Sequence, residues 1–310
     1  SLMKILIELP TWLGDTVMAT PAIENLVNHF NNVEITLIGS FVSIEALKNH
    51  PKVAKTYVLD KKFSNLYKTL KMLENFDLFF SFRGSLRAKF MKFCITANKK
   101  FQFDKNKFNI GHQVEKYNNF VNVALKINTI ASSLILHNAS HAKDIKSKLL
   151  GINPGASYGS AKRWYPKEFA DVASRLSSQY DIIIFGGPEE KNIAKDIERH
   201  LIEKGVVNYK NLAAIITVKE LISQIANLDL FITGDSGPMH LAAALQIPTV
   251  AIFGPTEDKV TSQWMNDKSI IVKKNLECQP CMKRECPLKH HNCMKLIESA
   301  EVLRAAKGLN

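Results

Sequence analysis

The chain alternates short β-branched segments with amphipathic helical segments, and it does so in two separate stretches. In the first half, the strand-like segments are KILIEL, VEITLIGS, KTYVLD and DLFFSF. The helical patterns between them are PAIENLVNHF, SIEALKNH and residues 63–74. Such alternation is typical of a parallel sheet covered by helices. The first half therefore predicts a Rossmann-like domain.

The second half begins the same alternation again. Its strand-like segments are LLGINPG, DIIIFGG, DLFITGD and PTVAIFGP. Its helical segments are WYPKEFADVASRLSS, PEEKNIAKDIERHLI, VKELISQIANL, HLAAALQI and a closing helix over residues 297–307. Between the halves, residues 104–127 favour a basic helix and residues 128–148 are polar and poorly patterned. We therefore predict two α/β domains, 1–145 and 146–310, a division that suits 310 residues.

The charge balance points to an anionic partner. The chain has 41 Lys and Arg against 29 Asp and Glu, a formal net charge of +12. Lysine-rich compositional drift is the alternative explanation. Nucleic acid is disfavoured, because the basic residues are scattered and no aromatic-interleaved binding motif accompanies them. No apolar run is long enough to span a membrane, and Glu8 and Asp15 interrupt the first one. We expect a cytoplasmic protein.

Ligands of open parallel sheets bind beyond the carboxyl ends of the strands, so residues that directly follow strands are the candidates. After the first strand comes PTWLGDTVMATPA, where we expect Gly14 to allow a tight turn and Asp15 to precede a helix near Thr16. Asp15 is either the N-cap of that helix or a carboxylate able to take a proton from an incoming hydroxyl.

Two segments of the second half suit a nucleotide. In NPGASYGSAKRWYP, small residues and then Lys162 and Arg163 lead into a helix, which suits a phosphate or diphosphate, although the P-loop spacing is absent. An ordinary basic loop is the alternative. In FGGPEE, the bare backbone of Gly186 and Gly187 could lie against a base or ribose, or simply make a turn.

The segment TGDSGPMHLAAA carries the strongest signal. Asp235, Ser236 and Gly237 end a strand and start a helix, with His240 in its first turns. Main-chain donors and the serine hydroxyl there form an anion site, and Asp235 could hold sugar hydroxyls. Nothing in the sequence resembles a G-x-S-x-G, Walker or H-E-x-x-H motif. The G-x-G-x-x-G fingerprint is also missing after the first strand, which disfavours dinucleotide oxidoreductases.

Four cysteines lie within sixteen residues, in a segment that also contains His290 and His291. The cysteines are Cys278, Cys281, Cys286 and Cys293. The first pair has C-x-x-C spacing, which can hold zinc, but the second half departs from the usual finger spacing. A reducing compartment argues against disulfides. We expect a structural loop with free thiols and no metal site.

Together these residues resemble glycosyltransferase family 9, the ADP-heptose:lipopolysaccharide heptosyltransferases. The resemblance is carried by LPTWLGDTVMATPAI, NPGASYGSAKRWYP and TGDSGPMHLAAALQIPTVAIFGPT. The segment CQPCMKRECPLKHHNCM is similar to the heptosyltransferase II branch. The resemblance spans nearly the whole chain and is weakest over residues 85–145.

The resemblance implies a GT-B fold, with two Rossmann-like domains facing across a cleft. It implies that the N-terminal domain binds the acceptor, that the C-terminal domain binds ADP-heptose, and that transfer inverts the anomeric carbon in one displacement. Asp15 matches the catalytic base and Lys162 the lysine that stabilises the departing diphosphate. The donor contacts would come from Ser157, Lys162, Gly186, Gly187, Asp235, Ser236, Gly237 and His240.

On the acceptor side, Arg83, Ser85 and Arg87 follow the DLFFSF strand and, with Gly14, would receive acceptor phosphates or carboxylates. The charge of +12 then suits an anionic lipid A–core acceptor at the inner membrane face. No cofactor or metal is implied. Two alternatives stay open: a nucleotide-sugar epimerase or hydrolase that needs no acceptor, and a non-catalytic nucleotide-sugar or nucleic-acid binding protein.

Overall fold

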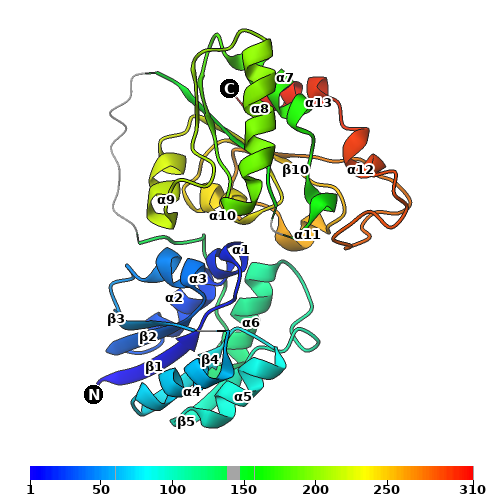
Figure 1. The fold of residues 1–310 in the computed structure, drawn as a ribbon. Helices are drawn as coiled ribbons and strands as arrows, with labels where there is room; N and C mark the ends of the chain where they lie inside the picture. Colours follow the sequence, from blue (N-terminus) through cyan, green and yellow to red (C-terminus); the bar gives the residue numbers. More distant parts are fainter. Residues whose placement is uncertain (60, 138–146, 157, 310) are drawn as a thin grey trace. The chain divides into compact units, whose positions relative to one another are not determined.

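The computed structural model describes residues 1–59, 61–137, 147–156 and 158–309, and Figure 1 shows their fold. They form two compact units, within Ser1–Ala139 and Ser140–Asn310. The predicted domain boundary between residues 145 and 146 lies outside the described residues. Among the described helices, none is both long and apolar enough to cross a bilayer.

The first unit is built on a parallel sheet with the strand order β3-β2-β1-β4-β5. Its strands are β1 Met3–Glu8, β2 Val33–Gly39, β3 Val53–Val58, β4 Phe76–Ser81 and β5 Ala97–Gln102. The order reverses between β1 and β4, and Glu8 is in register with Ser81 at the carboxyl ends of these two strands. Such a reversal is the switch point at which open α/β sheets bind ligands.

Helices cover this sheet because each buries one apolar stripe against it. They are α1 Leu13–Met18, α2 Thr20–Asn28, α3 Phe41–Leu47, α4 Phe63–Met72, α5 Leu86–Cys94 and α6 Gln113–Leu125. Leu66 and Leu70 of α4 share one core with Met91 of α5 and Phe79 of β4. α4 and α5 therefore cover the same face of the sheet (Figure 1).

One expectation for this unit was wrong, and two of its elements were missed. The helix predicted over residues 104–127 begins only at Gln113, because His112 caps it and Gly111, with φ +88°, turns the chain beforehand. β5 and α5 were not predicted at all. The β5 sequence ANKKFQ is rich in lysine, and its strand character comes from pairing with β4.

The second unit has a parallel sheet with the order β11-β10-β9-β6-β7-β8. Its strands are β6 Leu149–Asn153, β7 Asp181–Ile184, β8 Tyr209–Asn211, β9 Leu230–Gly234, β10 Thr249–Ile252 and β11 Ser269–Val272. β8 and β11 were missed because they are short edge strands defined mainly by pairing. The switch point lies between β6 and β9.

Trp164 lies in the core of this unit, packs on Phe169 and donates a hydrogen bond to the Ile297 carbonyl at 3.2 Å. Its α-helices are α7 Pro166–Leu176, α8 Lys191–Glu203, α9 Val218–Ala226, α10 Gly237–Ala244, α11 Asp258–Thr261, α12 Asn292–Lys295 and α13 Ser299–Gly308. Short 3₁₀ turns cover Ser160–Lys162 and Pro188–Glu190.

Candidate functional site

A buried carboxylate lies at the switch point of the first sheet. Glu8 ends β1 with its side chain fully buried, and Ser81 at the end of β4 donates a hydrogen bond to Glu8 Oε1 at 2.5 Å. Arg83 Nη1 lies 3.8 Å from Glu8 Oε2. Burial raises the pKa of Glu8, while the Ser81 hydroxyl and the positive charges of Arg83 and Arg87 oppose that rise. Glu8 was not predicted as a site residue, because in the sequence it is simply the last residue of a strand.

The predicted acceptor residues Arg83, Ser85 and Arg87 have different surroundings. Ser85 accepts a hydrogen bond from the Ala88 amide at 3.1 Å and is the N-cap of α5, so its hydroxyl already has a structural role. Arg87 has two buried nitrogens, Nε and Nη2, that bond to no described residue. An unsatisfied buried guanidinium is costly, and an anionic oxygen of a ligand would relieve that cost.

Asp15 does not stand where the sequence suggested. Helix α1 already begins at Leu13 with Trp12 as its N-cap, so Asp15 is the third helical residue and not the cap. Gly14 is helical too and makes no tight turn. The half-buried Asp15 carboxylate therefore lies in the first helical turn, where the helix dipole favours negative charge.

Neighbouring groups hold α1 and show where Asp15 lies. Thr16 donates to Ser43 on α3 at 2.8 Å, which ties α1 to that helix. Burial raises the pKa of Tyr117 on α6 well above its usual range, and the negative charge of Asp15 adds to that rise. Asp15 thus lies within electrostatic reach of α6, on the same unit as Glu8.

An ion pair marks the switch point of the second sheet. Lys162, which follows β6, has its Nζ 2.9 Å from Asp235 Oδ2, which follows β9. The two side chains are 14% and 5% exposed, so the pair is well shielded. Thr256 donates a hydrogen bond to the same carboxylate oxygen at 2.6 Å. The structure therefore brings together two residues that the sequence placed in separate motifs, 73 positions apart.

The N-terminus of α10 has no side-chain cap. Ser236 is at the N-cap position but makes no side-chain cap bond. Its hydroxyl instead accepts a hydrogen bond from Asn153 Nδ2 at 2.8 Å. Gly237 is the first helical residue, and His240 is buried within α10. Of the predicted donor residues, Ser157 lies outside the described part of the chain.

Glu190 is a second carboxylate that the sequence analysis did not single out. It is buried, and a Cβ on Gly155 would lie only 2.1 Å from its Cγ. A Cβ on Gly187 would lie 2.9 Å from its Oε2, and one on Gly186 3.1 Å from its Cβ. Glu190 thus lies beside glycines that follow β6 and β7. The glycine pair next to acidic residues in FGGPEE was the signal available in the sequence.

The cysteine segment packs against the loop that carries Lys162. The Ala161 amide donates to the Arg284 carbonyl at 3.0 Å, and a Cβ on Gly159 would lie 2.3 Å from that same oxygen. The Tyr158 ring lies beneath both Lys162 Nζ, at 4.7 Å, and Arg284, at 5.3 Å. This close approach requires glycine at position 159 and fixes the loop beside the ion pair.

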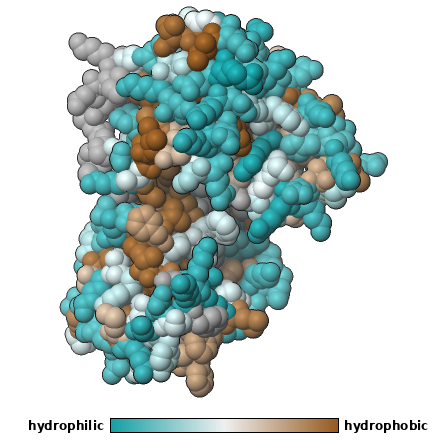
Figure 2. All heavy atoms as spheres, viewed as in Figure 1, coloured by the Kyte–Doolittle hydropathy of each residue, from teal (hydrophilic) through white to brown (hydrophobic). Residues whose placement is uncertain are grey.

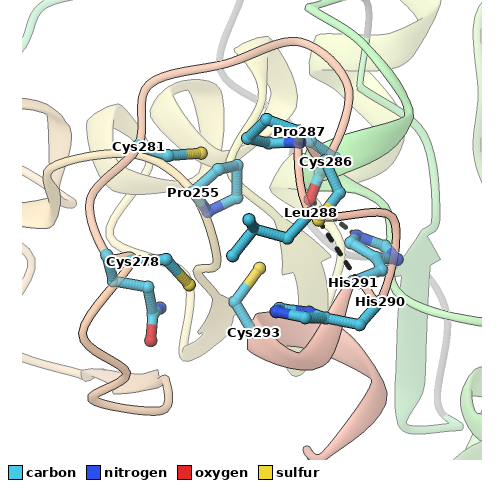
Figure 3. Close-up of a pocket in the computed structure, with 11 residues that line it drawn as sticks. Pro255, Cys278, Cys281, Cys286, Pro287, Leu288, His290, His291 and Cys293 are labelled. Carbon is cyan, nitrogen blue, oxygen red and sulfur yellow. Dashed lines mark hydrogen bonds between the residues drawn. The ribbon is translucent and has the colours of Figure 1, made fainter.

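The four clustered cysteines and both histidines line one small cavity of about 20 Å³ (Figure 3). The side chain of Leu288 lies among the sulfur atoms. The thiols of Cys278, Cys281, Cys286 and Cys293 are free. Burial raises the pKa of Cys293 to about 11, and its thiol neighbours add to the rise. The His291 amide donates to Cys286 Sγ at 3.3 Å.

A different group brings metal-ligating atoms closest together among the described residues. Glu24, His50 and His137 have ligand atoms within 4.8 Å of one another. However, the Lys52 amide donates to His50 Nδ1 at 3.0 Å, so the neutral ring carries its proton on Nε2. Nε2 then donates to Glu24 Oε1 at 2.7 Å. This tautomer makes the group a hydrogen-bond cluster, in which His50 lowers the pKa of Glu24.

Comparisons with known proteins show the family of the chain. Residues 112–292 match the family described as Glycosyltransferase family 9 (heptosyltransferase). The chain is 42% identical to the "Lipooligosaccharide heptosyltransferase 2" of Campylobacter jejuni serotype O:2, over 99% of this chain and 98% of that protein. It is 26% identical to the protein of that name from Haemophilus influenzae, over 87% and 88%.

Among solved structures, the E. coli ADP-heptose lps heptosyltransferase II matches with a TM-score of 0.80 and 21% identity, over 99% of this chain and 98% of that one. The likeness shows the fold, and the predicted GT-B class of two parallel-sheet α/β domains is confirmed. The family match and the full-length similarity agree with each other. The chain belongs to glycosyltransferase family 9, the heptosyltransferases.

Proposed function

We propose that this chain transfers a heptosyl group from ADP-heptose to a heptose of the lipopolysaccharide or lipooligosaccharide inner core. The observation that carries the proposal is the 42% identity, over 99% of the chain, to a lipooligosaccharide heptosyltransferase 2. No feature of the described residues favours an epimerase, a hydrolase or a pure binding protein over this reaction.

The second unit, residues 146–310, is the proposed donor domain. Lys162 would leave Asp235 to stabilise the diphosphate, and Asp235 would then accept hydrogen bonds from sugar hydroxyls. Ser157, Ser236, Gly237 and the amides of α10 would lie against the phosphates, with His240 supporting that turn. Gly186 and Gly187 would lie against the nucleoside, and Glu190 would accept hydrogen bonds from its ribose hydroxyls.

The first unit, residues 1–145, is the proposed acceptor domain, with Asp15 as the base. As the acceptor hydroxyl attacks the anomeric carbon, its proton passes to the Asp15 carboxylate. The new bond joins the acceptor oxygen to that carbon, while the bond to the diphosphate oxygen breaks and ADP leaves with its electron pair. One displacement inverts the anomeric configuration. The side chains supply the base and the positive charge for this step.

Anionic groups of the acceptor would bind at the switch point of the first sheet. Arg83 and Arg87 supply two positive charges there, and Glu8 neutralises one of them and orients both. The unsatisfied nitrogens of Arg87 support this assignment. Gly14 and Ser85 would adjoin the acceptor through their backbone. An acceptor of this kind carries lipid, so we place the reaction at the cytoplasmic face of the inner membrane.

Transfer from ADP-heptose to a heptose-bearing, truncated core tests the proposal. ADP release and the mass of the acceptor are followed together. We expect ADP release only in the presence of acceptor and a mass gain of one heptose. ADP release without acceptor would favour an epimerase or hydrolase, and binding without turnover of any nucleotide sugar would favour a binding protein.

A further inference from the structure

The outer face of α5 carries large apolar side chains that are exposed to solvent. Leu86 is 83% and Phe93 87% exposed, and Phe90 between them is also exposed. Their spacing of four and three residues places all three along one side of the helix. The opposite side is buried through Ala88 and Met91. α5 therefore has two apolar faces, and only one of them packs against the sheet.

The neighbouring helix α4 extends this surface. Tyr67 and Met72 are exposed on it, Met72 to 72%. Because α4 and α5 cover the same face of the sheet, their outer sides belong to one surface of the unit. We call it the α4–α5 surface: Tyr67, Met72, Leu86, Phe90 and Phe93 with the lysines around them. Figure 2 shows brown and tan side chains among teal ones over these helices, at the lower end of the view.

The charges on the α4–α5 surface are all of one sign. Residues 61–73 and 82–103 contain no aspartate or glutamate. The basic residues in these two segments are Lys61, Lys62, Lys68, Lys71, Arg83, Arg87, Lys89, Lys92, Lys99 and Lys100. Lysines that flank exposed leucine and phenylalanine are the composition of helices that lie in a bilayer interface. A protein partner would instead need a depletion of lysine at the core of its interface.

We propose that the α4–α5 surface is where the N-terminal unit lies on an anionic lipid bilayer. This inference rests on the proposed function, because it assumes an acceptor anchored in that bilayer. Leu86, Phe90 and Phe93 would enter the headgroup region, and Lys68, Lys71, Lys89 and Lys92 would pair with lipid phosphates. Charge complementarity with the anionic headgroups selects this occupant.

The position of α5 relative to the acceptor residues supports the same orientation. α5 starts at the carboxyl edge of the sheet, where Ser85 caps it and Arg87 faces Glu8. Leu86 lies between them in sequence, and Phe93 follows about 10 Å farther along the helix axis. The exposed apolar row thus begins beside the proposed acceptor site, which would keep a lipid-linked sugar and its anchor close to the same helix.

Vesicle partition tests the surface directly. Vesicles of phosphatidylethanolamine and phosphatidylglycerol would be compared with vesicles of phosphatidylcholine alone, without donor or acceptor. We expect the wild type to bind the anionic vesicles and to be released by salt. Leu86→Ser with Phe93→Ser should weaken partition at least about tenfold. Lys89→Gln with Lys92→Gln should weaken it about fivefold per charge.

Val207→Ser with Ile215→Ser is the matched control, since these residues are 87% and 69% exposed but lie on the second unit. The control should bind like the wild type. Equal binding of the Leu86/Phe93 variant and the wild type would overturn the proposal. A wild type that does not bind anionic vesicles would also overturn it. So would a wild type that is dimeric in size-exclusion chromatography when the Leu86/Phe93 variant is monomeric, because the surface would then be a protein interface.

A second readout separates this proposal from the proposed function. Transfer onto a deacylated, water-soluble core oligosaccharide should proceed at the wild-type rate in the Leu86/Phe93 variant. Transfer onto acceptor embedded in anionic vesicles should fall with vesicle partition. If the wild type transfers to neither acceptor, the proposed function fails. Vesicle partition, which needs no donor or acceptor, would still test the α4–α5 surface by itself. If the variant loses both activities equally, the surface has a structural role and the bilayer proposal fails.

Discussion

The switch points of the two sheets both pair a carboxylate with basic side chains, but they do so differently. In the second unit, one lysine meets one carboxylate directly, with Lys162 Nζ 2.9 Å from Asp235 Oδ2. In the first unit, the fully buried Glu8 faces Arg83 at 3.8 Å and feels the charge of Arg87 as well. On the proposed assignment, the donor side would therefore have a cation that can exchange its partner for a diphosphate. The proposed acceptor side would have a fixed carboxylate that orients two arginines.

The difference follows from the chemistry of the side chains. A lysine is a flexible point charge, so Lys162 can swing between Asp235 and a ligand without rearranging the backbone. Glu8 is held by strand register and by the Ser81 hydroxyl, and its arginines present planar forks suited to phosphate or carboxylate. We therefore expect donor-side mutations to act on turnover and acceptor-side mutations, apart from the base, to act on acceptor affinity.

The largest expected effect is at Asp15. Asp15→Asn should lower kcat by about 10²–10⁴-fold, because the amide cannot take the proton of the acceptor hydroxyl. ADP affinity, measured by calorimetry, should stay unchanged, since Asp15 is on the first unit. Asp104→Asn, on the same unit, is the control and should keep wild-type turnover. An Asp15 variant with near-normal kcat would remove Asp15 from the role of base.

Lys162 probes the donor side of the comparison. Lys162→Ala should lower kcat about 10²–10³-fold and also weaken ADP binding, because the positive charge of Lys162 no longer stabilises the leaving diphosphate. Lys167→Ala, an exposed lysine of α7, is the matched control. Acceptor KM should change little. Wild-type turnover and ADP affinity together would show that the Lys162–Asp235 pair is purely structural.

Glu8 probes the acceptor side. Glu8→Gln should raise the acceptor KM about tenfold, because loss of a charge-assisted contact leaves Arg83 and Arg87 poorly oriented. ADP affinity should not change. Glu45→Gln removes a carboxylate of the same unit that pairs with Lys48 at 2.9 Å, and it should be neutral. An unchanged acceptor KM in the Glu8 variant would contradict the inference that Glu8 orients Arg83 and Arg87 for the acceptor.

The same variant should also change the pH dependence of stability. Burial raises the pKa of Glu8 in the folded state above its unfolded value. The favourable contribution of Glu8 to the free energy of unfolding is thus complete below the unfolded pKa and is lost as pH rises through the folded pKa. The free energy of unfolding of the wild type relative to Glu8→Gln should fall as pH rises across this window. Urea denaturation at a series of pH values measures it, and a rise would contradict the burial argument.

The smallest expected effect is in the cysteine cavity beside the donor loop. Cys278→Ser with Cys281→Ser should cost about 1–2 kcal/mol in unfolding free energy and leave kcat nearly unchanged, because polar hydroxyls replace packed thiols. Thermal denaturation and the transfer assay would be run together. Stoichiometric zinc in elemental analysis of the wild type would overturn the expectation of a structural loop with free thiols.

The parts of the site that were predictable lie in short, continuous motifs. Lys162 and Asp235 each follow a strand in a segment of small and polar residues, so both could be named from local pattern. Glu8 and Glu190 could not be distinguished from ordinary strand and helix residues, because only burial makes them unusual. Asp15 was named as a candidate, but its place in α1 was misjudged because nothing local separates a turn at Gly14 from a helix that begins at Leu13.

The sequence by itself determined the two α/β units and most of their strands, because hydrophobic periodicity is a local property of the chain. Tertiary structure alone decided the strand orders, the Lys162–Asp235 pair, the burial of Glu8 among arginines and the uncovered side of α5. β5 shows the reason most simply, since a lysine-rich segment becomes a strand only through its pairing with β4. Pairing and burial depend on residues far apart in the chain, which no local pattern contains.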